Sequence, residues 1–82
     1  MKKTIWSEGH NALVKLIREK RKEAGLTQED VARALEQRQN WVSHLESNGR
    51  RIDVVEYVRL AEIIGFDAAD ELRKLIPVIV GK

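Results

Sequence analysis

The sequence predicts an all-α domain of five short helices. Apolar residues recur at intervals of three and four positions along the chain, no stretch in its body alternates like a β-strand, and glycines or helix-capping residues separate the periodic segments. At 82 residues, of which 43% are hydrophobic and 34% charged, the chain suits one domain with a modest core. We expect a single domain over 1–82, with its core at about 11–76 and an apolar tail at 77–82.

The first two helices are separated by a glycine. The first helix is expected to begin at Ser7 or Asn11 and to run to Ala24, where Gly25 ends it. The second is expected to begin at Thr27, because its hydroxyl can cap the chain while the aspartate three residues later reaches back in an approximate capping box.

Turn residues and a second capping box place the next two helices. A short turn at Glu36–Gln37 leads to a third helix from about Arg38 to Ser47. Asn48–Gly49 is a turn pair, in which we expect one residue with a positive φ angle. Asp53 is expected to cap the fourth helix, with Glu56 completing the box.

A short fifth helix completes the predicted fold. Gly65 ends the fourth helix, and Phe66 before Asp67 indicates a hydrophobic staple at the start of the fifth. Pro77 is expected to break this helix, and the β-branched residues at 78–80 favour an extended tail. The residues expected to face the core are Leu13, Leu16, Ile17 and Ala24, then Val31, Ala32 and Leu35, then Val42 and Leu45, then Val54, Tyr57, Val58, Ala61 and Ile64, and finally Leu72, Leu75 and Ile76.

The charged residues are distributed unevenly, although the net charge is only +2. The N-terminal helix and the segment around Arg50–Arg51 are basic, whereas residues 52–82 are acidic in sum. This asymmetry fits a face directed toward a polyanion, and an ordinary solvated surface is the alternative. The chain has no cysteine and no apolar stretch long enough for a signal peptide or membrane span, so we expect a cytoplasmic protein without thiolate metal sites.

The second and third predicted helices carry the main functional signal. Together they have the spacing that two helices crossing steeply over a tight turn require, at Gln28, Ala32, Val42 and Leu45. The small Ala32 lies under the crossing, and Val42 and Leu45 fill the angle between the helices. The outer face of the third helix then projects from the domain, where its N-terminal residues can enter a DNA major groove.

Two segments resemble a known family, GLTQEDVARAL at 25–35 and WVSHLESNGRRIDVVEYVRLAEIIG at 41–65. They are similar to the phage Cro and lambda-repressor type of helix-turn-helix, also called the XRE family, over roughly 13–72 without a gap. The resemblance implies a compact five-helix lambda-repressor-like domain, with the helix-turn-helix formed by the second and third helices. The residues in family register are Thr27-Gln28-Glu29, Ala32, Val42-Ser43, Leu45-Glu46, Arg50-Arg51 and Leu60-Ala61.

The chain departs from the family pattern at the turn between these helices. Glu36 stands where the family usually has glycine, so it must either adopt a positive φ at some cost or remodel the turn. Arg38 stands where the family often has serine or proline. The crossing angle of the two helices depends on how this turn is formed.

The resemblance implies specific roles in binding DNA. Gln28 matches the family glutamine that contacts a backbone phosphate and the first residue of the recognition helix. The residues expected to read bases are Gln39, Asn40, Ser43 and His44, and amide side chains can make bidentate contacts to adenine. The residues expected to bind phosphate are Gln28, Arg38, Arg50 and Arg51.

Alternatives remain open for these residues. The polar face of the third helix could be an ordinary solvated face, and Gln28 could be a simple N-terminal helix residue without a binding role. Trp41 could pack against the fourth helix and the Asn48–Gly49 turn, or touch a sugar and a thymine methyl group. Arg51 could form a salt bridge with Glu46 in place of a phosphate contact.

The sequence therefore predicts a sequence-specific transcriptional regulator, a repressor, that inserts helix 38–47 into the major groove of double-stranded DNA. We expect a homodimer whose contact uses the apolar C-terminal segment LRKLIPVIVGK at 72–82; the alternative is that this segment folds back over the first and fifth helices of its own chain. No cofactor, metal site or catalytic site is predicted: Ser43 and His44 diverge by about 100° on a helix, and His10 lies far from His44 in sequence. The alternative from another class is an antitoxin-like protein-interaction module whose main role is to bind a partner protein.

Overall fold

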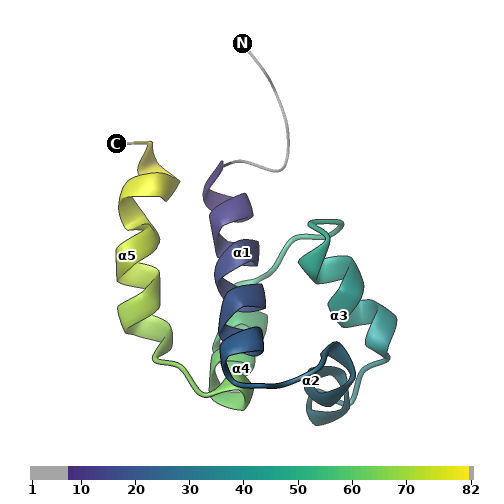
Figure 1. The fold of residues 1–82 in the computed structure, drawn as a ribbon. Helices are drawn as coiled ribbons and strands as arrows, with labels where there is room; N and C mark the ends of the chain where they lie inside the picture. Colours follow the sequence, from purple (N-terminus) through teal and green to yellow (C-terminus); the bar gives the residue numbers. More distant parts are fainter. Residues whose placement is uncertain (1–7, 82) are drawn as a thin grey trace.

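A computed structural model describes residues 8–81, which form five helices (Figure 1). Their bounds are Glu8–Glu23 for α1, Gln28–Ala34 for α2, Gln39–Glu46 for α3, Val54–Ile64 for α4 and Ala68–Val80 for α5. Residues 8–81 contain no strand, so the all-α prediction is confirmed for this range. Two predicted positions lie outside the described residues: Ser7, one of the two expected starts of the first helix, and Lys82, the end of the expected tail. None of the described helices has the length and apolar character needed to cross a membrane.

The first helix lies at the centre of the domain, with α5 along one side and the α2–α3 pair on the other (Figure 1). The core forms where α1, α2, α3 and α4 meet. The largest fully buried side chains are Ile17, Val31, Val42, Leu45 and Leu60. No residue of α5 is fully buried, so this helix is an outer layer that packs mainly on α1.

The predicted capping boxes at the starts of α2 and α4 are confirmed by their hydrogen bonds. Asp30 N donates to Thr27 Oγ1 at 3.0 Å, and Thr27 N donates to Asp30 Oδ2 at 2.9 Å. Asp53 and Glu56 make the same reciprocal box at α4, with bonds of 2.7 and 3.1 Å. Asp67 accepts from a backbone N–H in the first turn of α5. Each cap satisfies backbone donors that a helix N-terminus leaves without partners.

Two non-glycine residues adopt left-handed conformations at helix ends, Glu36 with φ 60° and Asn48 with φ 65°. Behind Glu36, Gln37 N donates to Ala32 O at 2.8 Å, which closes the end of α2 in a Schellman motif. Of the two outcomes predicted for the turn, Glu36 therefore takes the positive φ, and α2 and α3 keep a tight connection. The positive φ expected in the Asn48–Gly49 pair is also confirmed.

Several predicted core positions are wrong. Ala24, Val54, Val58, Leu72 and Ile76 are exposed, with Val54 retaining 76% of its accessible surface. Val14 and Leu60, which were not among the predicted core residues, are buried. Apolar residues occupy more than one side of α4, so periodicity alone could not identify which side packs inward. Three-dimensional packing buries the side formed by Tyr57, Leu60, Ala61 and Ile64.

The predicted break at Pro77 is also wrong, because α5 continues through Pro77 to Val80. A proline inside a helix removes one backbone hydrogen bond and crowds the carbonyl four residues earlier, here that of Arg73. Both residues are exposed and no residue of α5 is buried, so the missing hydrogen bond does not lie in the core. The last turn of α5 packs closely on α1, since a Cβ at Gly9 would lie 2.9 Å from Ile79 Cγ1. This contact favours the helix over the extended tail that local propensity predicted.

Replacing Glu36 by glycine should raise the free energy of unfolding by up to about 1 kcal/mol, because glycine reaches φ 60° without the Cβ penalty. The measurement is urea-induced unfolding followed by circular dichroism. Ala34→Gly is the matched control: it sits in right-handed helix two positions earlier and should lower stability by about 1 kcal/mol. A Glu36→Gly variant less stable than the wild type would contradict a strained turn.

Candidate nucleic-acid interface

The predicted helix-turn-helix is present as α2 and α3. Of the residues expected at the crossing, Ala32, Val42 and Leu45 are each at most 1% exposed, and Gln28 is half-buried. Leu35, at the end of α2, joins the same core cluster. Because this side of α3 is buried against α2 and the core, its other side faces solvent at the edge of the domain (Figure 1).

The N-terminal turn of α3 presents exposed polar side chains. Gln39 and Asn40 are exposed, and so is Arg38, whose side chain does not cap the helix. One turn further along, Ser43 is half-buried and its Oγ donates to Asn40 O at 3.4 Å. Two adjacent amides and a hydroxyl therefore lie near one end of an exposed helix face, where they can donate and accept hydrogen bonds.

His44 is exposed, but its ring lies over the turn that follows α3. Gly49 leaves the space that the ring occupies, since a Cβ at this position would overlap His44 Cδ2 and Nε2. Any larger residue at 49 would displace the imidazole. His44 thus lies further from the amide pair, and nearer the Asn48–Gly49 turn, than helix periodicity alone suggested.

A buried ion pair fixes α3 against α1. Arg21 Nε donates to Glu46 Oε2 at 2.6 Å, and Arg21 Nη2 donates to Glu46 Oε1 at 2.9 Å. The third nitrogen, Arg21 Nη1, donates to the carbonyl of Leu26 in the α1–α2 loop at 2.8 Å. The side chains are 10% and 3% exposed. Among the described residues Glu46 thus pairs with Arg21, and the alternative pair with Arg51 is wrong.

The same carboxylate orients the start of α2. Gln28 Nε2 donates to Glu46 Oε1 at 3.1 Å, and Gln39 Nε2 donates to Gln28 Oε1 at 3.3 Å. Gln28 therefore touches the first residue of α3, as the family resemblance implied. A continuous chain of hydrogen bonds runs from Arg21 through Glu46 and Gln28 to the exposed end of α3.

Trp41 and Arg50 form a second cluster on the side of α3 that faces α4. Trp41 is half-buried against the core, which confirms the packing alternative for this residue. The guanidinium carbon of Arg50 lies 4.6 Å from the Trp41 ring centroid, in a cation–π contact. Arg50 Nη2 also donates to Glu56 Oε2 at 2.9 Å. Arg50 thus has a structural role at the start of α4, whereas Arg51 is exposed.

The turn after α3 is held by the N-terminal part of α1. Asn48 Nδ2 donates to Asn11 Oδ1, which leaves Asn48 Oδ1 to accept from His10 Nδ1 at 3.0 Å. Burial lowers the pKa of the His10 imidazole from its usual value; the hydrogen bond with Asn48 opposes this shift and the charge of Arg51 adds to it. The neutral imidazole is therefore favoured in the folded protein.

The structure also brings together residues that sequence reasoning did not select. Arg18 and Lys22 of α1 line an open cleft of ≈ 300 Å³ beside α3, together with Ser43, Ser47 and the side chain of Gln28. The sequence signal for this arrangement was the four-residue spacing of Arg18 and Lys22 on a basic helix, but its relation to α3 required the tertiary structure.

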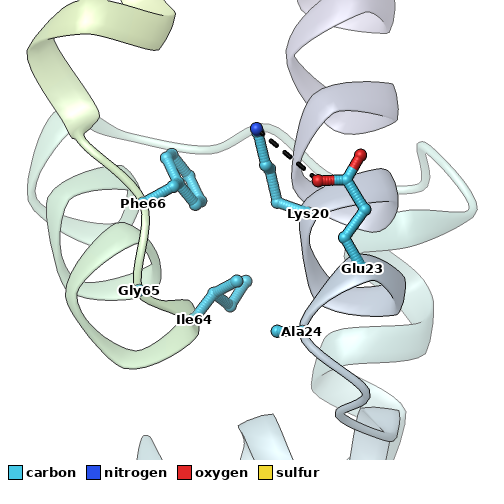
Figure 2. Close-up of a pocket in the computed structure, with 6 residues that line it drawn as sticks. All are labelled: Lys20, Glu23, Ala24, Ile64, Gly65 and Phe66. Carbon is cyan, nitrogen blue, oxygen red and sulfur yellow. Dashed lines mark ion pairs between the residues drawn. The ribbon is translucent and has the colours of Figure 1, made fainter.

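A separate hollow of ≈ 210 Å³ lies where α1 meets the α4–α5 turn, lined in part by Ile64 and Phe66 (Figure 2). Lys20 Nζ lies 3.6 Å from Glu23 Oε1 and 3.3 Å from Glu71 Oε2. The hydrogen bond with Glu71 raises the pKa of Lys20. The ion pair between Lys20 and Glu71 joins α1 to α5. Because two carboxylates neutralise Lys20, the hollow offers no uncompensated charge to a ligand.

A family model described as a helix-turn-helix domain matches residues 12–75, which is most of the chain. The protein is therefore a helix-turn-helix protein. An XRE-family like protein from Pseudomonas syringae pv. tomato str. DC3000 is 39% identical in sequence, with a TM-score of 0.78 and 82% of each chain covered. The chain belongs to the XRE family of helix-turn-helix proteins, a class of DNA-binding transcriptional regulators.

More distant solved structures share the fold. A variant of the restriction-modification controller protein C.Esp1396I, bound to its highest affinity operator site, has a TM-score of 0.74 at 23% identity, with 90% of this chain and 97% of that chain covered. The clp gene regulator ClgR from C. glutamicum has a TM-score of 0.68 at 20% identity, with 89% and 91% covered. Among curated protein sequences none matches this chain significantly.

Converting Glu46 to glutamine should lower the free energy of unfolding by about 3 kcal/mol, because Arg21 would remain as a buried charge without a counter-ion. Asp70→Asn is the matched control, since it removes a carboxylate from an exposed pair with Arg73 and should change stability by less than about 1 kcal/mol. Urea unfolding of both variants measures the difference. Equal effects of the two substitutions would contradict a structural role for the buried pair.

Proposed function

We propose that this protein is a sequence-specific regulator of transcription that inserts α3 into the major groove of double-stranded DNA. The observation that carries the proposal is the exposed amide pair Gln39–Asn40 at the N-terminus of α3, with Gln39 bonded to Gln28 at the start of α2. A recognition helix contacts base edges with its N-terminal residues, and this is where the polar side chains gather.

The proposed base contacts follow from the chemistry of the face. The amides of Gln39 and Asn40 can each donate to and accept from adenine N7 and N6. Ser43 lies one turn further along the helix, where it would reach the edge of the groove. His44 would first have to turn away from Gly49 to contact a base, so we expect it to contribute less than the amides.

The proposed phosphate contacts surround this face. Gln28 would donate to a phosphate from the N-terminus of α2, and the exposed Arg38 and Arg51 would approach the backbone on either side of the groove. Arg50 donates two N–H groups to Glu56 and stacks on Trp41, so its contribution to phosphate binding would use its remaining N–H groups.

We infer that the regulator acts in the cytoplasm and that it is a repressor. Repression is expected because a protein bound in the major groove of a promoter excludes other proteins from that site. The operator-bound form of C.Esp1396I, which shares the fold, supports a DNA-bound state for this architecture. The direct test is selection of bound duplexes from random DNA, followed by a reporter gene under a promoter that carries the recovered sequence. Recovery of no sequence preference would contradict the proposal.

Alanine substitution of Gln39 or Asn40 should weaken binding to the selected site by about 1–3 kcal/mol, because each removes a bidentate contact to a base. Binding to random duplexes should change little. Gln37→Ala is the matched control, since it removes an exposed amide from the turn before α3 and should alter neither affinity. Fluorescence anisotropy with both duplexes gives the comparison. An equal loss on selected and random DNA would show that another face reads the sequence.

We further propose that the protein is a homodimer, joined through an apolar surface at the start of α4 and along α5. The exposed large apolar residues of these helices are Val54, Val55, Val58, Leu72, Ile76, Val78, Ile79 and Val80. An apolar groove, lined in part by Leu72 and Val54, connects the two helices. Apolar patches of this kind mark protein interfaces, and a two-fold dimer would place two copies of α3 in half-sites about 34 Å apart.

The double variant Val54→Glu, Ile76→Glu should be monomeric at micromolar concentration, because each glutamate would be buried without a partner in the dimer. Both positions are at least half exposed in the single chain, so the fold should persist. Ala34→Glu, an exposed position on α2, is the control and should remain dimeric. Sedimentation velocity distinguishes the forms. A wild-type protein that stays monomeric at all concentrations would contradict the dimer and favour a different protein as the partner of this surface.

A further inference from the structure

We propose that Arg18 and Lys22 of α1 form a second phosphate-binding site, which binds the DNA backbone at the edge of the groove occupied by α3. This inference rests on the proposed function and extends it. It gives α1, which contributes Ile17 to the core, a direct contact with the sugar–phosphate backbone as well.

The cleft beside α3 supplies the geometry. Arg18 and Lys22 lie on its α1 side, while Ser43 and Ser47 lie on its α3 side and Gln28 belongs to the start of α2. Ser43 belongs to the proposed base-reading face and Gln28 to the proposed phosphate contacts, so the cleft adjoins the surface that would meet DNA. Guanidinium, ammonium, hydroxyl and amide groups all donate hydrogen bonds to phosphate oxygens.

Helix periodicity places Arg18 and Lys22 on the side of α1 that faces α3. Residues four, three and four positions apart share one helix face, so Arg18 and Lys22 lie on the same side of α1 as Asn11 and Lys15. The hydrogen bond from Asn48 to Asn11 shows that this side of α1 meets the turn after α3. The basic stripe formed by Lys15, Arg18 and Lys22 therefore begins near this turn and continues to the cleft beside Gln28.

The pattern of ion pairs distinguishes Arg18 and Lys22 from the basic residues whose charge a carboxylate already neutralises. Within residues 8–81, Arg18 and Lys22 lie in no ion pair with a carboxylate, although both are exposed. The charge of Arg21 in the same cleft is balanced by Glu46. Basic residues elsewhere in this range that do pair with carboxylates are Lys20, Arg33, Arg50, Arg73 and Lys74. The cleft thus carries an excess of positive charge that an external anion can neutralise.

If Arg18 and Lys22 served only to keep the surface soluble, they could lie anywhere on it. Instead, both lie beside the helix that would enter the groove. In B-DNA the phosphates border the groove, so a helix seated in it brings neighbouring elements of its own domain close to the backbone. Arg18 and Lys22 would each neutralise one phosphate. Such contacts raise affinity for every sequence and set the position of α3 in the groove.

The test is the salt dependence of binding by the double variant Arg18→Gln, Lys22→Gln in the full chain. The probes are a 30-base-pair duplex carrying the sequence that the wild type selects and a random duplex of the same length. The slope of log K against log salt concentration should become less steep by about 2 per bound protomer, since each phosphate contact contributes roughly 0.9. Affinity should fall by a similar factor on both duplexes.

The matched control is Arg73→Gln, Lys74→Gln, which removes the same charge from α5, on the side of α1 away from α3 (Figure 1). This control should leave the slope unchanged. Ethylation interference on the selected duplex adds a positional readout, because the phosphates contacted by the cleft should lose their interference in the α1 variant only. Thermal unfolding checks that both variants are folded, and exposed positions should shift the midpoint by less than about 3 °C.

The outcomes separate this inference from the proposed function. Salt-dependent binding by the wild type with an unchanged slope in the α1 variant overturns the second phosphate site and leaves the role of α3 standing. Equal flattening by the α5 control also overturns it, because the effect would then reflect net charge alone. A wild type without salt-dependent binding to either duplex overturns the proposed function and this site together.

Discussion

The position of α3, the proposed recognition helix, depends on one buried ion pair, Arg21 with Glu46. Arg21 uses three nitrogens, two on the carboxylate of α3 and one on the carbonyl of Leu26, so one side chain connects α1, the α1–α2 loop and α3. A buried pair of this type adds little net stability, because desolvation of both charges offsets their attraction. Its bidentate geometry has one good arrangement, and this constraint fixes the position of α3 relative to α1.

The same carboxylate links the fold to the surface. Glu46 accepts from Gln28, and Gln28 accepts from Gln39, so the exposed end of α3 is coupled to the buried pair through two further hydrogen bonds. Each bond restricts the rotamers available to an amide that would otherwise sample several. Hydrogen-bonding groups that are already held in place lose less conformational entropy on binding. This is a physical reason for the proposed base-contacting amides to lie on a helix that the core and the ion pair hold in position.

Two residues in the left-handed conformation lie at the two ends of α3. Glu36 lies in the turn before α3 and Asn48 in the turn after it. A residue with a Cβ in this conformation costs about 1–3 kcal/mol, and it persists only where the surrounding structure over-determines it. Here the buried crossing of Ala32, Val42 and Leu45 holds the first turn, while Asn11 and His10 hold the second. The core thus sustains a tight turn that usually calls for glycine.

The sequence by itself determined the features that depend on near neighbours. The capping pairs Thr27–Asp30 and Asp53–Glu56 lie three residues apart, so their hydrogen bonds form within one helical turn and could be predicted, as could the helix-turn-helix from its local spacing. Only the tertiary structure decided which carboxylate pairs with Arg21, since 25 positions separate it from Glu46. It also decided which side of α4 is buried and that α5 continues through Pro77, because packing against α1 outweighs local propensity there. Such contacts join residues whose proximity no pattern along the chain encodes.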